Sequence, residues 1–240
     1  MVTKVRLSEA GVWKDTVTGV GIGDTLYSVE RDGSLHSTSN RGNTTLGTGY
    51  RTKLLLADGT DEGNLYAVER NGNLYKVDPE DGTWTMMGEP GGWSDVVAAD
   101  AVDGWIYFVD TDGDLTAVNP ESGDFHELGG NYDTRSLWYF QEHVYILEND
   151  GSLYKVHAET GEYERFGSEG AYSDTTTATL HDRKFFAVED DGALGVTSLD
   201  DSSYEELTDE DLSNVRHLFS AGEHLYAIEK DGTLYRLDLD

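Results

Sequence analysis

The chain has 240 residues, of which 47 are Asp or Glu and 17 are Lys or Arg, so its formal net charge is -30. A field of this sign repels duplex DNA, RNA and anionic membrane surfaces, and we therefore exclude nucleic acid and membranes as partners. The 37% of hydrophobic and 11% of aromatic residues indicate a folded chain, and the absence of cysteine excludes disulfides and thiolate metal sites.

Acidic residues are spread along the whole chain rather than gathered in one tail. Because a folded chain with this charge repels itself at low ionic strength, we expect it to work where salt screens charges strongly. This composition resembles that of cytoplasmic proteins from extreme halophiles, and an acidic, cation-binding secreted module is the alternative. Residues 1–10 contain no apolar core of signal-peptide length, which predicts a cytoplasmic protein, or a secreted one if a leader has been removed.

The first complete copy of a recurring unit starts with an apolar run at residues 26–29, followed by a hairpin turn and a leucine, Leu35. The turn glycine recurs at intervals of 39, 41, 38, 41 and 40 residues, at Gly33, Gly72, Gly113, Gly151, Gly192 and Gly232. Propeller blades of four strands have a period of about forty residues. Six copies therefore predict an all-β, six-bladed β-propeller with four-stranded antiparallel blades, forming a single domain over residues 1–240.

Each copy also predicts the place of its strands within a blade. The run before the turn is apolar on both faces, as expected of a second strand stacked between neighbouring blades. The run after it is the third strand, and a turn such as residues 78–82 leads to a polar fourth strand at the outer edge. The segment 198–203 lacks both Pro and Gly, so we expect blade 5 to be the least regular.

The last copy ends after its third strand, whereas residues 3–7 precede the first complete copy and match a fourth strand. We therefore predict that residues 4–7 pair beside residues 233–237 and complete the sixth blade. This pairing would close the ring and remove the open edges at the junction.

The segment Leu74-Tyr-Lys-Val-Asp-Pro-Glu-Asp-Gly82 and its counterparts resemble quinoprotein-type propeller repeats, and the recurring glycine and aromatic pattern resembles tachylectin-like lectin propellers. The resemblance covers the full chain and implies a fold without an activity, because such repeats occur in enzymes, lectins and scaffolds. The tryptophan-docking and calcium signatures of quinoprotein dehydrogenases are not recognisable, so we predict no cofactor.

Superposing the copies gives a ring of aromatic positions before the inner strands, each with a short polar residue two positions later. The aromatic positions are Trp13, Tyr50, Trp93, Tyr132 and Tyr172, with Leu212 in the sixth copy. The polar positions are Asp15, Thr52, Asp95, Thr134, Asp174 and Asn214. At one mouth of the channel such groups would suit a sugar or cyclic ligand. The alternative, which we favour, is that the aromatics wedge between blades while the polar side chains cap turn amides.

Five of the 17 basic residues lie in the segments that lead into the inner strands, namely Lys14, Arg51, Lys53, Arg135 and Arg216. They would either receive an anionic ligand group or neutralise nearby acidic residues, and we favour the second interpretation.

A carboxylate ends the second strand in every copy, at Glu30, Glu69, Asp110, Glu148, Glu189 and Glu229. This acidic ring would hold Ca²⁺ or Mg²⁺ if its members converge. The alternative that we favour is that each carboxylate accepts amides of its own or the neighbouring hairpin. The sequence has no Asp-x-Asp-x-Asp-Gly calcium loop and no recognisable catalytic motif.

The sequence thus predicts a monomeric, non-enzymatic binding or scaffold module for an unknown protein, small molecule or glycan in high salt. A lectin that uses the aromatic ring is the first alternative. A metal-dependent hydrolase or lactonase-like propeller, with carboxylates at the channel mouth, is the second.

Diluting salt from molar to millimolar levels should unfold the protein cooperatively, because screening of its net charge of -30 is lost. Near-ultraviolet circular dichroism along the dilution series measures this transition. Full stability at millimolar salt would contradict the halophilic interpretation.

Overall fold

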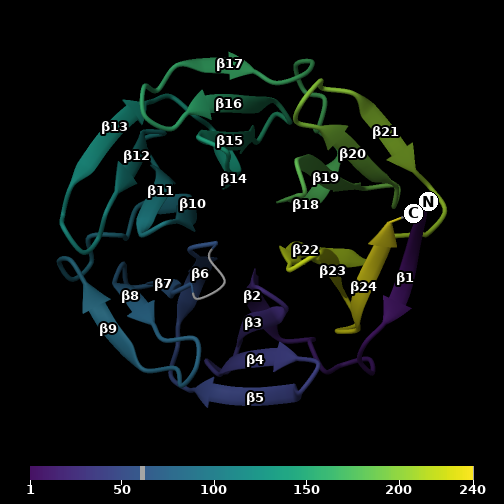
Figure 1. Cartoon of the computed structure of the whole chain (residues 1–240), viewed down its shortest axis with the longest axis horizontal. Coiled ribbons are helices and arrows are strands. Elements are labelled where there is room, and N and C mark those ends of the chain that lie inside the picture. The colour runs from purple at the N-terminus through teal and green to yellow at the C-terminus, as the bar shows by residue number, and fades with distance from the viewer. Residues whose placement is uncertain (60–62, 240) are drawn as a thin grey trace.

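Six four-stranded antiparallel sheets stand around a central channel in this computed structural model, which describes residues 1–59 and 63–239 (Figure 1). The predicted all-β, six-bladed propeller is therefore confirmed. Blades 1 to 5 each use four consecutive strands, and blade 6 combines the last three strands with the first. Among the residues described, no helix has the length and hydrophobicity needed to cross a bilayer.

The strands are numbered along the chain and are grouped here by their position in the blade, from the channel outwards. The innermost strands are β2 (Thr16–Ile22), β6 (Thr52–Ala57), β10 (Val96–Val102), β14 (Thr134–Phe140), β18 (Thr175–His181) and β22 (Val215–Ala221). The second strands are β3 (Thr25–Glu30), β7 (Leu65–Glu69), β11 (Trp105–Asp110), β15 (His143–Glu148), β19 (Lys184–Glu189) and β23 (His224–Glu229). The third strands are β4 (Leu35–Ser39), β8 (Leu74–Val77), β12 (Leu115–Val118), β16 (Leu153–His157), β20 (Leu194–Ser198) and β24 (Leu234–Leu239). The outermost strands are β5 (Gly42–Gly47), β9 (Trp84–Met87), β13 (Phe125–Gly129), β17 (Tyr163–Arg165), β21 (Tyr204–Leu207) and β1 (Val2–Arg6).

The core lies between neighbouring blades rather than at one centre. All five residues of β7 are buried, as expected of a strand that packs against a blade on each side. One cluster joins Tyr107 and Val109 of blade 3 to Leu137 and Val144 of blade 4, and similar clusters fill the other seams. By contrast, β17 and most of β9 are exposed, which fits their place at the outer edge.

The N-terminal strand closes the ring, as predicted. Strand β1 runs antiparallel to β24, with Lys4 opposite Leu237, and Figure 1 shows the two ends of the chain side by side at this blade. The strand covers Val2–Arg6, slightly earlier than expected from the sequence. The Lys4 ammonium also lies 2.9 Å from the Glu229 carboxylate of β23, which ties the closing strand to its blade.

Blade 5 is as regular as the others, so the prediction of an irregular blade was wrong. Strands β20 and β21 pair without a register shift. The connecting turn uses Ser202 at a φ of 58°, where other blades use a glycine. The amide of Ser202 donates to the carbonyl of Ser198, and the amide of Gly82 donates in the same way to Asp78. A serine in the left-handed region thus reproduces the glycine turn.

The blades associate in pairs, a feature that the sequence repeats do not indicate. Across the seams 1–2, 3–4 and 5–6, a side chain of one innermost strand accepts an amide of the next, in the pairs Thr18–Leu55, Asp100–Tyr139 and Thr177–Leu218. Across the other three seams, a basic residue at a bulge of the innermost strand donates to carbonyls of the next linker, from Lys53, Arg135 and Arg216. The ring therefore consists of three double blades.

Deleting residues 1–8 should lower the melting temperature by at least about 10 °C. The deletion removes the pairing of β1 with β24 and exposes an open edge, and a loss of about 1 kcal/mol shifts the midpoint of a domain of this size by about 2–4 °C. Differential scanning calorimetry in molar salt measures the shift. An unchanged midpoint would contradict closure of the ring by β1.

Candidate functional site

One end of the propeller, the linker face, is built from the linkers between blades and the hairpin turns that carry the turn glycines. In all six blades the amide of the residue at the aromatic position donates to the carbonyl of a turn glycine. The donor–acceptor pairs are Tyr50–Gly33, Trp93–Gly72, Tyr132–Gly113, Tyr172–Gly151, Leu212–Gly192 and Trp13–Gly232, at 2.8–3.1 Å. These bonds bring the linker residues predicted as a ring to the same end of the channel.

The aromatic side chains of this ring point into the seams between blades. Trp13, Trp93, Tyr132 and Tyr172 are between 3% and 9% exposed, and Tyr50 is half-buried. Trp93 packs against Phe108 with ring centroids 5.0 Å apart. These contacts explain the recurrence of the aromatics by packing, the alternative that we favoured, while ligand binding by them stays a prediction.

In blades 2 and 4, the linker residue that accepts the turn amide lies one position after the aromatic residue, instead of two positions after it as in blades 1, 3 and 5. Turn amides donate to the carbonyls of Asp15, Asp95 and Asp174 in blades 1, 3 and 5, but to those of Arg51 and Asp133 in blades 2 and 4. The linkers before blades 2 and 4 are one residue shorter between the aromatic and the strand. Thr52 and Thr134 therefore begin the innermost strands instead of belonging to the ring, whereas the carboxylates of Asp15, Asp95 and Asp174 are exposed on the linker face.

Each carboxylate of the predicted acidic ring has a donor close by. Those of Glu30, Glu69 and Glu189 accept hydroxyl groups, Asp110 and Glu148 accept backbone amides, and Glu229 pairs with Lys4. Burial raises the pKa of Glu148. Within the described parts of the chain, no three His, Asp or Glu side chains come together as a metal site would require. A metal at this ring stays a prediction.

Three of the five predicted basic residues bridge adjacent blades. Lys53 Nζ donates to three carbonyls between Trp93 and Val96 at 2.9–3.1 Å. Arg135 Nη2 donates to the Tyr172 carbonyl at 3.2 Å, and Arg216 donates to carbonyls of Trp13 and Thr16. Burial lowers the pKa of Arg135 and Arg216, and the buried Arg216 Nε has no hydrogen-bond partner among the residues that the structure describes.

Four arginines surround a cavity of about 490 Å³ where blades 6, 1 and 2 meet on the linker face. We call it the arginine pocket, and its arginines are Arg31, Arg51, Arg70 and Arg216. Glu30 is the one carboxylate among its described lining residues, and it accepts hydrogen bonds from the hydroxyls of Thr16 and Ser28. None of the ion pairs among the described residues involves any of the four arginines.

Arg51 and Arg216 were predicted from the sequence as site residues, whereas Arg31 and Arg70, which lie in the hairpin turns, were not. The signal was present one position after the acidic ring. Blades 1, 2 and 6 carry Arg31, Arg70 and Lys230 there, whereas blades 3, 4 and 5 carry Thr111, Asn149 and Asp190. Positive charge is therefore concentrated on one half of the linker face.

A smaller cavity of about 300 Å³ adjoins the arginine pocket and shares Tyr50 and Arg51 with it. Its wall is an aromatic corner in which Tyr75 and Trp84 meet edge to face, with ring centroids 4.8 Å apart. Trp84 is 59% exposed, and Asn71 supplies a polar group. This corner combines an aromatic surface with hydrogen-bonding groups, which is the combination expected of a sugar site.

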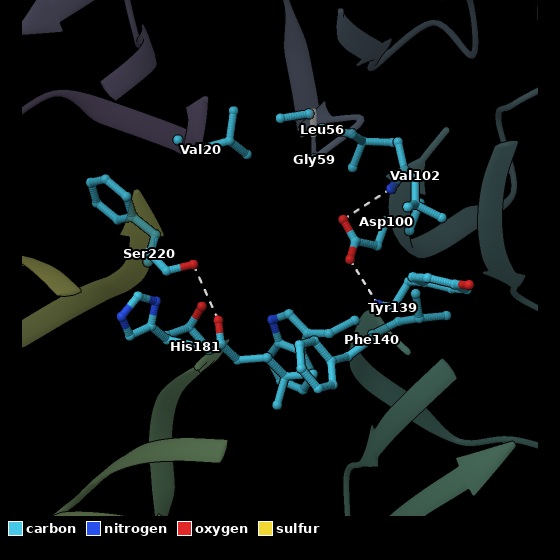
Figure 2. A pocket seen from close by; sticks show the side chains of 18 of the residues that line it. Val20, Leu56, Gly59, Asp100, Val102, Tyr139, Phe140, His181 and Ser220 are labelled. Carbon is cyan, nitrogen blue, oxygen red and sulfur yellow. Dashed lines mark hydrogen bonds between the residues drawn. The ribbon is translucent and has the colours of Figure 1, made fainter. Parts of the chain in front are cut away.

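The opposite end of the channel holds a cavity of about 570 Å³, the channel cavity, lined by all six innermost strands. Figure 2 shows the Asp100 carboxylate in this cavity, facing His181 and Ser220 across it. Asp100 Oδ1 accepts the amide of Ala101 at 2.9 Å, and Oδ2 accepts the amide of Tyr139 at 2.8 Å. Because protein surrounds the side chain, burial raises the pKa of Asp100 to about 7.

A family profile described as outer membrane protein assembly factor BamB matches residues 6–240. The chain belongs to this family. The family match confirms the quinoprotein-type resemblance drawn from the repeats. Comparison with curated proteins finds no match.

Solved structures similar to this BamB-family chain share its fold. A Bacteroides thetaiotaomicron protein of unknown function has a TM-score of 0.75 and 16% identity over 98% of this chain and 72% of that one. BamB from Moraxella catarrhalis has a TM-score of 0.59 and 12% identity over 93% of this chain and 85% of its own. The computationally designed Ika8 protein has a TM-score of 0.61 and 17% identity, over 93% and 71%. At these identities the likeness concerns the fold alone, so function has to be argued from the residues of the chain itself.

Proposed function

We propose that this BamB-family chain is a non-enzymatic, monomeric scaffold that binds a protein partner at its linker face and works in high salt. The arginine pocket is the observation that carries this proposal. Four of the ten arginines of the chain line one cavity, although the chain has 47 acidic side chains with which they would otherwise pair. These scarce positive charges lie together with no ion pair to any described residue, which favours a partner that brings the carboxylates.

Arginine chemistry suits such a contact. The planar guanidinium forms two parallel hydrogen bonds with a carboxylate, which adds direction to the attraction between charges. In molar salt, attraction over distances beyond a few ångströms is screened. Direct contacts with the partly desolvated guanidinium groups that line the pocket remain. We therefore assign the pocket to a carboxylate-rich segment of the partner.

The exposed carboxylates of Asp15, Asp95 and Asp174 would favour one orientation of the bound partner on the linker face. They lie on the same face as the arginine pocket, and two of them belong to blades 3 and 5, on the less basic half of the face. A partner with acidic and basic regions in the matching order would be attracted in one orientation, and like charges would oppose the others.

A carbohydrate-binding lectin is the second candidate, and the aromatic corner favours it. Trp84 and Tyr75 present aromatic surface beside Asn71, Glu69 and Arg51 in a cavity of about 300 Å³. In this form the lectin hypothesis rests on Trp84 rather than on the buried aromatic ring.

Charge reversal tests the scaffold proposal. In affinity capture from an extract of the source cells in molar KCl, Arg31→Glu/Arg70→Glu should recover at least about tenfold less partner than the unchanged protein, because two attractive contacts become repulsive. Arg41→Glu is the matched control, since Arg41 is also exposed but lies in the turn between β4 and β5, outside the pocket. The partner is then identified by mass spectrometry and its binding remeasured with purified proteins.

Equal capture by the pocket variant and the control would contradict a partner site at the arginine pocket. Binding to a glycan array in molar salt that Trp84→Ala abolishes, with no protein captured, would instead assign the chain to the lectins.

A further inference from the structure

We propose that the channel cavity binds a small organic ammonium ion, with Asp100 as its counter-ion. This site lies at the opposite end of the propeller from the arginine pocket, so the inference does not depend on the proposed function.

The channel cavity has the size and the charge for such a ligand. Its volume of about 570 Å³ falls within the usual range of small-molecule sites, about 300–1,000 Å³. Asp100 and Asp182 are the carboxylates of its described lining, in which there is no Lys or Arg. A cation therefore enters a negative cavity in which no fixed positive side chain competes for Asp100.

The seam between blades 3 and 4 uses a hydrogen-bond acceptor at position 100 but does not require a charged one, because threonine hydroxyls accept the strand amides across seams 1–2 and 5–6. Strand pairing places Asp100 opposite Tyr107, and the same register in the other two double blades places Val20 opposite Tyr27 and Thr179 opposite Phe186. Val20 and Thr179 line the same cavity. Two of the three equivalent positions are thus filled by uncharged side chains. Enclosing a carboxylate without a cation destabilises a protein, which points to a role in binding.

The Asp100 side chain is held in place and still has room for a ligand. Each of its oxygens accepts one backbone amide, from Ala101 on its own strand and from Tyr139 on the next blade. A carboxylate oxygen can accept more than one hydrogen bond, so both oxygens keep capacity for a donor inside the cavity. The side chain is partly accessible from the cavity while the surrounding blades shield it from bulk solvent.

The other walls suit the hydrocarbon part of an amine. Figure 2 shows Leu56 and Val102 near Asp100, with Phe140 on the neighbouring blade next to Tyr139 and His181 across the cavity. Apolar groups gain by leaving water in contact with such walls, and an ammonium next to an aromatic face gains a further attraction. An N–H donor at one end and an apolar body at the other therefore match the cavity.

Calorimetric titration with phenethylammonium in molar NaCl at pH 8 tests the site. We expect saturable binding to the unchanged protein and a loss of at least about tenfold in affinity for Asp100→Asn and Asp100→Val. The asparagine variant keeps a side-chain oxygen for the Tyr139 amide and should therefore fold, whereas the valine variant removes this acceptor, and circular dichroism checks the fold of both. Asp103→Asn is the matched control, because Asp103 is exposed in the turn between β10 and β11 of the same blade and is not among the described lining residues of the cavity.

Affinity should also depend on pH. Burial raises the pKa of Asp100 to about 7, so the carboxylate is ionised above this pH and neutral below it, and the affinity should fall by up to about tenfold per unit as the pH drops below 7. The charged or titratable groups on the neighbouring elements are Lys53 on β6, Tyr107 and Asp110 on β11, Arg135 and Tyr139 on β14, with His181 and Asp182 across the cavity. The pKa of His181 is lowered by burial, which keeps its ring neutral at pH 8.

Three results would overturn the proposal. The first is equal affinity of the Asp100 variants and the unchanged protein. The second is equal binding of 2-phenylethanol, which has the same body but no charge, because recognition would then be apolar only. The third is disappearance of phenethylammonium binding when KCl replaces NaCl, which would assign Asp100 to potassium.

Discussion

The contact between each turn glycine and the following linker is the constraint on which the rest of this propeller depends. Six glycine carbonyls accept six linker amides, and all six glycines have φ between 80° and 93°. A Cβ on Gly33 would lie 2.6 Å from the Tyr50 carbonyl oxygen, and one on Gly151 would lie 2.1 Å from the Ser173 nitrogen. Glycine is thus required both for the backbone conformation and for the close approach of the linker.

Once the linkers are fixed, the two ends of the channel acquire opposite character. On the linker face, a hairpin turn of blade 1, the linker before blade 2 and the start of β22 in blade 6 bring Arg31, Arg51 and Arg216 around one cavity. At the other end the innermost strands enclose Asp100 in a cavity whose described lining has neither Lys nor Arg. We assign an acidic partner to the first end and a small cation to the second, so one rigid scaffold would serve two unrelated ligands.

Features that repeat were predictable from the sequence, and features that occur once were not. The number and order of the six blades were predictable from the turn glycines, the leucine after each turn and the closing strand. Arg31 and Arg216 are far apart in the chain and line the same cavity only because the ring closes. Their spacing in the sequence therefore could not predict that they lie together. Asp100 is one of 47 acidic residues, so the sequence does not single it out. Only the strand register shows that the equivalent position in blade 1 is occupied by Val20. The prediction of an irregular fifth blade was wrong because Ser202 adopts the left-handed conformation expected of glycine.

Comparing Gly33→Ala with Gly123→Ala by denaturant unfolding in molar salt tests the central claim most directly. Both glycines have positive φ, 86° and 80°, but a Cβ on Gly123 would meet nothing within 4 Å. The account predicts a loss of about 1 kcal/mol for Gly123→Ala, from backbone conformation alone, and a clearly larger loss, of about 3 kcal/mol, for Gly33→Ala. Equal losses would show that the linker contact does not constrain the fold and would contradict the account.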